Sequence, residues 1–565
     1  MAGARFLDVL GKVGYSARTM ELDLQGDRIF VSLSNPAKAF LYDALDLTPG
    51  EGIRVGQLFG RRWTDDAALM RQFKAMPESA STEVLGFVGL IVHEFTHHLD
   101  FLTTPFGLNF HSKTIREYWS MQDFAPVLLE NPELIPERLI DFETHFAAVQ
   151  RAGRDNVEIP WYSMRAWDSL ELKTYWENLR GQVLTFEAWG DASTIRPLGY
   201  QIEPGLLGEP NSITIFGQKF EVVTVNSFFT SIRPNGVNNW YLRHLTILET
   251  RAVANSLNWH LSLLGDAGLP DVHRFFVDVY GHEDLPRDYL FLFDLIARGF
   301  GSESFAALLA KGAIGAIREA LSMLITSCWY ALQAPPPMDQ MSLLASSSIV
   351  RLLVILQTFD DIRAGRRKGG FASFVDLAGE VDQSEQAMKM HFRPIGEIMP
   401  FCRALTEKLA AMNEEKTWNP EVRSHFGRVL SLLAGSLGRR DGYASLSGMP
   451  AEGNPVLGLD EDDVALLEPY EPPAGVREWF TFRRDALFVF RPRSWTIDKL
   501  ETHFGMHELT IPCTCGLIIS GRISRFKEGM ISVKCPQCER IHNVDIDDIF
   551  KINVGKTPKR QIGNS

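Results

Sequence analysis

The segment GLIVHEFTHHLDFL contains an HExxH arrangement, formed by His93, Glu94 and His97. Positions four apart on a helix share one face, so the two imidazoles can bind one metal ion. Glu94 then lies beside that face, where it can take a proton from a metal-bound water. Zinc lowers the pKa of such water to about 7 and polarises a carbonyl group. The pattern therefore predicts a hydrolytic metal centre, and the competing interpretation is a polar helix face without a metal.

This helix resembles that of the zincin metallopeptidases, in which an HExxH helix packs beneath a small sheet and a third ligand arrives from downstream. The resemblance implies a zinc-dependent hydrolase that acts on peptide bonds. It rests on the helix around His93 and His97 and does not extend over the length of the chain.

Glu249 is the expected third ligand. It lies in a predicted helix and is followed by Ala252 and Ala254. This pattern is similar to the glutamate helix of the gluzincins, where small residues allow close approach to the HExxH helix. The alternative is a solvated glutamate paired with Arg251 or Arg243.

His111 and Glu117 are the other candidates for the third ligand. His111 follows His97 by fourteen residues and precedes Ser112, a position similar to the third histidine of SprT/Spartan-like proteases. Glu117 follows His97 by twenty residues, which is the spacing of thermolysin-like enzymes, although the sequence around it does not otherwise match that family.

Other polar side chains near the motif have separate interpretations. Asp100, three residues after His97, could accept the second N–H of that imidazole and fix its tautomer, or pair with a nearby Arg or Lys. His98 points about 100° away from His97, which favours a packing role. Tyr241 and His244 come within reach of a tetrahedral oxyanion if the later helix supplies the third ligand.

A second cluster contains four of the six cysteines. Cys513 and Cys515 form one close pair, and Cys535 and Cys538 form another after a hairpin-length insert. This spacing predicts a tetrahedral four-cysteine zinc site, in which the metal holds the thiolates deprotonated and supplies folding energy. Because four cysteines fill the coordination sphere, we expect this zinc to be structural.

The cysteine segment resembles a zinc ribbon, and its CxC…CxxC order is similar to the C-terminal ribbon of the SprT-like proteases. Residues 516–540 carry five Lys and Arg against two Glu, which suits phosphate, an acidic protein surface or a solvated hairpin. In SprT-like proteins the ribbon follows soon after the catalytic helix, whereas here about 400 residues separate His111 from Cys513. A DNA–protein crosslink substrate is therefore not carried over.

The composition sets the broad class of the protein. The 565 residues are 45% hydrophobic and 22% charged, which indicates a globular chain with several cores. The net charge of −13 argues against general attraction to nucleic acid or an anionic membrane. Few cysteines indicate a reducing compartment, and the isolated Cys328 and Cys402 are expected in the core. Without a secretory leader or an apolar run of ~20 residues, we expect a cytoplasmic protein without a membrane segment.

The elements that must position these residues follow from hydrophobic periodicity. Apolar residues three and four apart predict a helix over residues 81–103, with Ser81 as its cap and an end at Pro105. Alternating residues predict hairpins over residues 19–33, around Gly26-Asp27, and over residues 212–229, around Gly217-Gln218.

The predicted fold is a mainly helical α+β protein with a zincin-like metallopeptidase domain, a helical extension and a small C-terminal zinc ribbon. Helical patterns fill most of residues 112–190 and the stretch from about 239 to 437. The predicted divisions are a catalytic domain at 1–290, a helical domain at 291–437, a linker and connecting segment at 438–500, and the four-cysteine zinc ribbon at 501–565.

The leading functional hypothesis is a zinc metallopeptidase with one catalytic and one structural zinc ion, and with a protein or peptide as its substrate. Its predicted metal ligands are His93, His97 and Glu249 in the catalytic site and Cys513, Cys515, Cys535 and Cys538 in the ribbon. One alternative is a binding or regulatory protein whose HExxH site is structural or vestigial. Another is a DNA-associated, SprT-like protease that uses the ribbon as a nucleic-acid tether.

Overall fold

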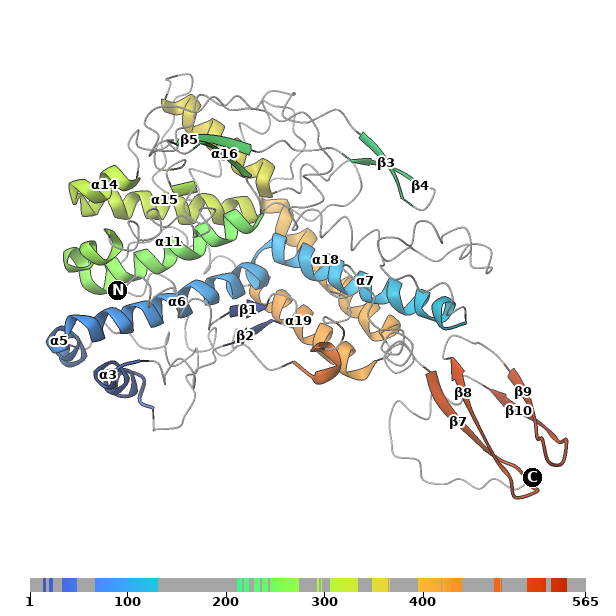
Figure 1. Cartoon of the computed structure of the whole chain (residues 1–565). Helices are drawn as coiled ribbons and strands as arrows, with labels where there is room; N and C mark the ends of the chain where they lie inside the picture. The colour runs from blue at the N-terminus through green and yellow to red at the C-terminus, as the bar shows by residue number, and fades with distance from the viewer. Residues whose placement is uncertain are drawn as a thin grey trace.

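The computed structural model describes residues 14–16, 20–23, 33–47, 67–130, 211–215, 218–222, 228–233, 236–241, 244–273, 292–293, 296, 305–333, 348–363, 365, 395–417, 419–438, 472–477, 479, 506–524 and 530–545. Over these residues the protein is mainly helical, with small two-stranded antiparallel sheets (Figure 1). The predicted mainly helical class is therefore confirmed. Among the described helices, none combines the length and apolar character that a bilayer span requires.

The helices are α3 (Asn35–Leu45), α5 (Ala67–Ala75), α6 (Glu78–Thr103), α7 (Pro105–Glu130), α11 (His244–Leu264), the 3-10 turn η5 (Gly265–Gly268), α14 (Phe305–Lys311), α15 (Ile314–Leu332), α16 (Ser348–Arg363), α18 (Ile395–Lys416) and α19 (Pro420–Gly438). The strands are β1 (Gly14–Ser16), β2 (Glu21–Asp23), β3 (Asn211–Ile215), β4 (Gln218–Val222), β5 (Phe228–Arg233), β6 (Gly236–Tyr241), β7 (Met506–Pro512), β8 (Ile518–Ser524), β9 (Met530–Lys534) and β10 (Ile541–Asp545).

Helix α6 lies at the centre of the helical part. It packs against α11, which packs against α15, and α15 in turn packs against α16 (Figure 1). Helices α3, α7 and α19 and the small β1–β2 sheet also contact α6. Most of the residues of α6 are buried, including both histidines of the HExxH motif. Because neighbouring elements cover α6 on several sides, the two histidines of the motif are enclosed by the fold and do not form a polar face toward solvent.

The corner between α6 and α7 is encoded by three adjacent residues. Thr104 is extended, as expected for a residue before proline, and Pro105 starts α7 at the position where its missing N–H costs nothing. The Thr104 hydroxyl accepts a hydrogen bond from the Gly107 N–H (3.2 Å) and so caps α7. A Cβ atom at Gly107 would lie 2.0 Å from the Phe101 carbonyl oxygen, so the tight corner requires glycine. The predicted helix end is confirmed.

The start of α6 differs from the prediction. The helix begins at Glu78 after Pro77, and Ser81 lies inside its first turns, where its hydroxyl donates to the Glu78 carbonyl (3.0 Å). The Glu83 carboxylate, also near the start of α6, accepts the Ser34 N–H (2.7 Å) at the N-terminus of α3. A negative charge is favourable at that helix end, so Glu83 ties α3 to α6.

The hairpin predictions are partly correct. Strand β2 pairs with the earlier strand β1. The predicted pairing across the Gly26-Asp27 turn involves residues 24–32, which lie outside the described residues. Strand β3 pairs with β4, with Ile215 opposite Gln218, so the predicted turn is shifted by one residue. Strands β5 and β6 form a separate pair, and the next helix starts at His244, not at about residue 239.

The C-terminal helices contact the helix that follows the motif. The Trp119 indole donates to the Thr417 hydroxyl (2.7 Å), and the Tyr118 ring meets the rings of Phe426 and Trp479 at 5.6 and 5.1 Å. Helices α18 and α19, predicted as part of a helical extension, thus pack against α7. Cys328 and Cys402 are fully buried, as expected.

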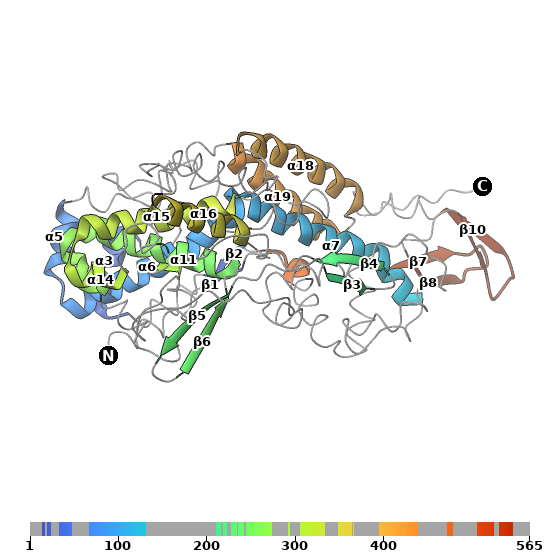
Figure 2. The same cartoon turned by 90° about the horizontal axis from the view of Figure 1, so that it is seen from above.

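The cysteine segment forms two antiparallel strand pairs, β7 with β8 and β9 with β10. Figures 1 and 2 show these strands at one end of the molecule, beyond α7 and α18. Within the predicted linker and connecting segment at 438–500, the structure describes Gly438 at the end of α19 and residues 472–477 and 479.

Candidate metal centre

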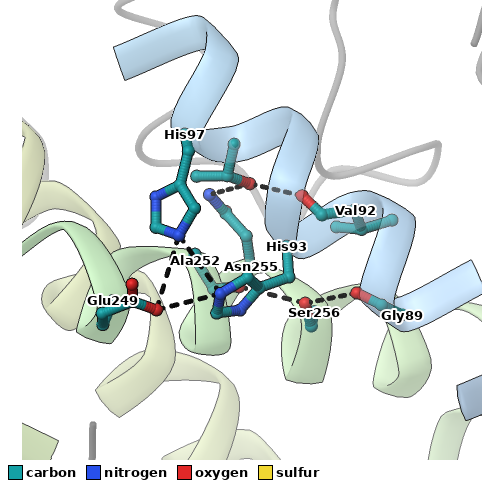
Figure 3. Close-up of polar contacts among 9 residues, drawn as sticks. Gly89, Val92, His93, His97, Glu249, Ala252, Asn255 and Ser256 are labelled. Carbon is teal, nitrogen blue, oxygen red and sulfur yellow. Dashed lines mark hydrogen bonds and ion pairs between the residues drawn. The ribbon is translucent and has the colours of Figure 1, made fainter. Parts of the chain in front are cut away.

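Helices α6 and α11 run antiparallel and bring distant residues together. Glu249, near the start of α11, contacts the HExxH histidines, whereas Ser256 donates to the Gly89 carbonyl (2.8 Å) and His260 contacts the Leu85 carbonyl (2.9 Å). As residue numbers rise along α11, those of its contacts on α6 fall. Figure 3 shows the result: both imidazoles point from α6 toward the carboxylate on α11.

Three ligand atoms converge in this site. The Nε2 atoms of His93 and His97 lie 3.2 Å apart, and Glu249 Oε2 lies 3.0 Å from the first and 3.4 Å from the second. A tetrahedral zinc ion with bonds of about 2.0 Å places its ligand atoms about 3.3 Å apart. The triangle therefore has the size that one zinc ion requires.

The chemistry of the donor set also fits a divalent cation. His93, His97 and Glu249 are 8%, 8% and 9% exposed, so the site is enclosed. Glu249 Oε2 has no well-aligned hydrogen bond, because the imidazole nitrogens and the carboxylate oxygen face a common point. A buried acceptor without a hydrogen bond is costly, and a cation at that point would remove the cost.

The charges of the site are strongly coupled. Burial alone would lower the pKa of His97, but the Glu249 carboxylate, helped by Glu94 and Asp100, raises it to about 9. Burial opposes the ionisation of Glu249, yet the charge on His97 and the contacts with both imidazoles hold its pKa well below the usual range. The negative charge that raises the pKa of His97 would also stabilise a metal ion bound to the two imidazoles.

Glu94 differs from its neighbours in exposure. It is partly exposed, whereas the residues on either side, His93 and Phe95, are buried. Its charge acts on His97, which places the carboxylate near the ligand face of α6. Glu94 is therefore a partly exposed carboxylate whose charge acts on the candidate ligand His97.

Small residues let the two helices approach closely. Ala252 and Ala254 on α11 are fully buried. On α6, a Cβ atom at Gly89 would lie 2.8 Å from His260 Nε2. Asn255 adds a polar link, because its amide donates to the Thr96 hydroxyl (3.3 Å; Figure 3). The role of Asn255 was not anticipated from the sequence. The feature that could have indicated it is a polar residue on the apolar face of the predicted helix.

Asp100 and Arg251 form an ion pair between α6 and α11, with Arg251 Nη1 donating to Asp100 Oδ1. Of the two roles predicted for Asp100, the pairing with an arginine is confirmed. The alternative in which a solvated Glu249 pairs with Arg251 is wrong, because Glu249 is buried and Arg251 has another partner. Arg243 lies outside the described residues.

The other third-ligand candidates are placed as follows. His111 is buried on α7, where its ring meets those of Phe101 and Phe110 at 6.3 and 5.3 Å, and it does not join the ligand group. Burial, helped by the charges of His425 and His98, lowers the pKa of His111 to about 3. Glu117 lies on α7, and its side chain is outside the described residues.

The remaining candidates near the motif are also accounted for. His98 is buried and stacks on the Phe95 ring at 5.7 Å, so the predicted packing role is confirmed. Tyr241 ends β6 and His244 begins α11, but both side chains lie outside the described residues. Their predicted role at an oxyanion stays a prediction.

The four cysteines of the ribbon form a second ligand group. Cys513 Sγ lies 3.4 Å from Cys538 Sγ, and Cys515 Sγ lies 3.7 Å from Cys535 Sγ. All four sulfurs lie within 4.8 Å of one another. Zinc–sulfur bonds of about 2.3 Å in a tetrahedron place sulfur atoms about 3.8 Å apart, so this group also has the size of one zinc site.

Two matching turns hold the cysteines. The Cys513 N–H donates to the Leu517 carbonyl (2.8 Å), and the Cys535 N–H donates to the Arg540 carbonyl (2.8 Å). Gly516 adopts a φ of 88°, which suits glycine in the first turn. Hydrogen bonding from the Cys515 backbone N–H, and then from the His542 side chain, lowers the pKa of Cys513 to about 5. His542 is thus a neighbour of a ligand.

Comparisons with protein-family models, with curated proteins and with solved structures found no match to this chain.

Proposed function

We propose that the protein is a zinc-dependent hydrolase of peptide bonds. The observation that carries the proposal is the convergence of three ligand atoms within 3.0–3.4 Å, supplied by His93, His97 and Glu249. This donor set, two imidazoles and one carboxylate, is the type that leaves a fourth position open for water or substrate. The peptide substrate is the class implied by the resemblance of the HExxH helix to the zincins.

Each residue has a defined task in this proposal. His93 and His97 bind the metal through Nε2, and the Glu249 carboxylate completes a set with a single negative charge. A bound zinc ion supplies an acidified water and an electrophile for the carbonyl oxygen. Glu94 takes the proton from that water and returns it to the leaving amine, a task that suits a carboxylate partly open to solvent.

The four-cysteine group supports a second part of the proposal, a structural zinc site in the ribbon. Its four sulfurs lie within 4.8 Å of one another and would fill all four positions around a tetrahedral zinc ion, so no position would remain for water or substrate. The expected metal content of the full-length protein is therefore two zinc ions per chain, one at each group.

The test combines metal analysis with an activity assay. Zinc is measured by elemental analysis in wild type, His93→Ala and Glu94→Gln, and turnover is measured with a library of internally quenched fluorescent peptides. We expect two zinc ions in wild type and in Glu94→Gln, and one in His93→Ala. Turnover should fall by about 10²–10⁴-fold in Glu94→Gln, because general-base catalysis contributes that much.

Glu83→Gln is the matched control, since Glu83 lies on the same helix but bonds to Ser34 at the far end from the ligands. It should keep both the metal and the turnover. A wild-type protein that holds one zinc ion, lost only when the cysteines are replaced, would refute the catalytic metal centre. Equal turnover in wild type and Glu94→Gln would refute the role of Glu94.

A further inference from the structure

The Asp100–Arg251 ion pair lies next to the metal ligands on both helices. Asp100 follows the ligand His97 by three residues on α6, and Arg251 follows the ligand Glu249 by two residues on α11. Both members are enclosed, with 0% of Asp100 and 4% of Arg251 exposed. The pair therefore joins the same two helices as the metal centre and is within one helical turn of a ligand on each.

Only one oxygen of the Asp100 carboxylate is used by the arginine. Arg251 Nη1 donates to Oδ1, whereas Oδ2 is buried without a hydrogen-bond partner. The Nδ1 atom of His97 is also buried without a hydrogen-bond partner. The two residues lie one turn apart on the same face of α6, and each charge acts on the other.

Binding of a metal ion at His97 Nε2 would determine the tautomer of that ring. A neutral imidazole that ligates through Nε2 carries its proton on Nδ1. That N–H would be a buried donor, and a buried donor without an acceptor is unfavourable. The unpaired Oδ2 of Asp100 is an acceptor of the right charge, one turn away along the same helix.

We infer that Asp100 is a positioning residue of the metal centre, which accepts the Nδ1–H of His97 while Arg251 holds its other oxygen. This inference rests on the proposed metal centre. The Arg251 guanidinium keeps the carboxylate in place from α11, so the ring of His97 is oriented by contacts from both helices. A pair that only stabilised the fold would affect unfolding and leave metal affinity unchanged.

Asp100→Asn is the sharpest variant, because asparagine keeps the size and retains one oxygen for Arg251. Its amide NH2 then faces His97 Nδ1, so a donor replaces the acceptor. Loss of such a carboxylate partner typically weakens metal binding by about 10–100-fold. Arg251→Lys is the second variant; it keeps the charge and should weaken binding less, since one point charge replaces the planar group.

The measurement is zinc affinity of the full-length protein by competition with a chelator, with the four-cysteine site as internal reference. The visible spectrum of the cobalt-substituted protein reports the geometry at the histidine site. Trp119→Phe is the control, because it removes a buried hydrogen bond to Thr417 in the same helical core. It should lower the melting temperature without changing either zinc affinity.

The expected result is a loss of affinity of about 10–100-fold at the histidine site of Asp100→Asn, an altered cobalt spectrum and an unchanged cysteine site. If Asp100→Asn does not fold, Arg251→Lys decides between the two roles through the same affinity. Wild-type affinity in a variant with a lowered melting temperature would overturn the inference and leave the metal centre standing. A wild-type protein with metal at the cysteines alone would overturn both.

Discussion

The two ligand groups are assembled by the chain in opposite ways. In the helical core, Glu249 lies 152 residues after His97, and the group exists only because α6 and α11 pack against each other. In the ribbon, all four cysteines fall between Cys513 and Cys538, on two tight turns. The first group depends on tertiary structure, and the second is nearly complete in local structure.

The two regions also differ in how much buried apolar surface stabilises them. Helix α6 is surrounded by buried apolar residues from several other helices, so we expect the hydrophobic effect to hold the histidine site in shape when no metal is bound. Among the described residues of the ribbon, the buried ones are Ile511, Cys513 and Cys535, and large apolar side chains such as Ile518 and Met530 are exposed. So little apolar burial cannot offset the entropy of ordering the chain. In the ribbon, therefore, metal binding and folding are expected to be one event.

Metal removal should separate the two regions most clearly. Treatment of the full-length protein with a strong chelator should unfold the ribbon, because structural zinc sites contribute about 10–16 kcal/mol to folding. The helices should persist, since their packing does not involve the metal. Far-ultraviolet circular dichroism follows the helices, and limited proteolysis with mass spectrometry follows the ribbon.

The matched control for this experiment is the Cys535→Ser/Cys538→Ser double variant. It should show the same cleavage in residues 506–545 without any chelator and should retain one zinc ion at the histidine site. Loss of helical signal on chelation would contradict the comparison, because it would mean that the core also depends on its metal. A ribbon that resists the protease after chelation would also contradict the comparison, because the ribbon would then fold without its metal.

Removal of the Glu249 carboxylate tests the comparison at the histidine site of the helical core. Glu249→Ala should lose the zinc ion of the histidine site while the ribbon keeps its own, because two imidazoles alone are a poor zinc site. The fold should survive, since the apolar contacts of α11 remain. Elemental analysis and the cobalt spectrum measure the loss.

Glu249→Gln distinguishes the effect of charge from that of shape, because it keeps the size of the side chain. We expect an intermediate affinity, since an amide oxygen is a weaker ligand than a carboxylate. Full zinc content in Glu249→Ala would show that another residue supplies the third ligand. A loss of helical signal in both variants would show that Glu249 is needed for the fold itself.

The comparison also explains what could be predicted from the sequence. The cysteine spacing and the HExxH spacing are local, so the amino-acid sequence alone predicts the four cysteines and the two histidines as ligands, together with the helix that carries His93 and His97. The corner at Thr104 is predictable for the same reason, because Pro105 dictates the conformation of the residue before it.

Features that depend on tertiary contacts are less predictable. Glu249 is one of three candidates in the sequence, because no local pattern states which distant residue reaches a given helix face. The prediction of Ser81 as a cap is wrong because the helix extends back to Pro77. The pairing of Asp100 with Arg251, and of Asn255 with Thr96, requires knowledge that α6 and α11 are antiparallel neighbours.

Acid sensitivity should further distinguish the core from the ribbon, through a histidine that binds no metal. Burial lowers the pKa of His111 from 6.5 to about 3, and the charges of His425 and His98 add to this effect. The folded state thus keeps the ring neutral, whereas the unfolded state binds a proton below pH 6.5. The stabilisation is therefore complete above pH 6.5 and is lost as the pH falls toward 3. At pH 5 the loss amounts to about 2 kcal/mol.

His111→Leu should remove this loss, because leucine fills a similar volume between Phe101 and Phe110 and cannot bind a proton. The free energy of unfolding, measured by urea titration of the helical signal with a chelator present at both pH values, should fall less between pH 7.5 and 5 than in wild type. His273→Leu is the control for the change of histidine to leucine itself, since the His273 side chain is exposed on the described surface. If His111→Leu and wild type lost equal stability on acidification, His111 would not be a source of acid sensitivity. The response of the core to pH would then come from other groups, such as His260, whose pKa burial lowers to about 4.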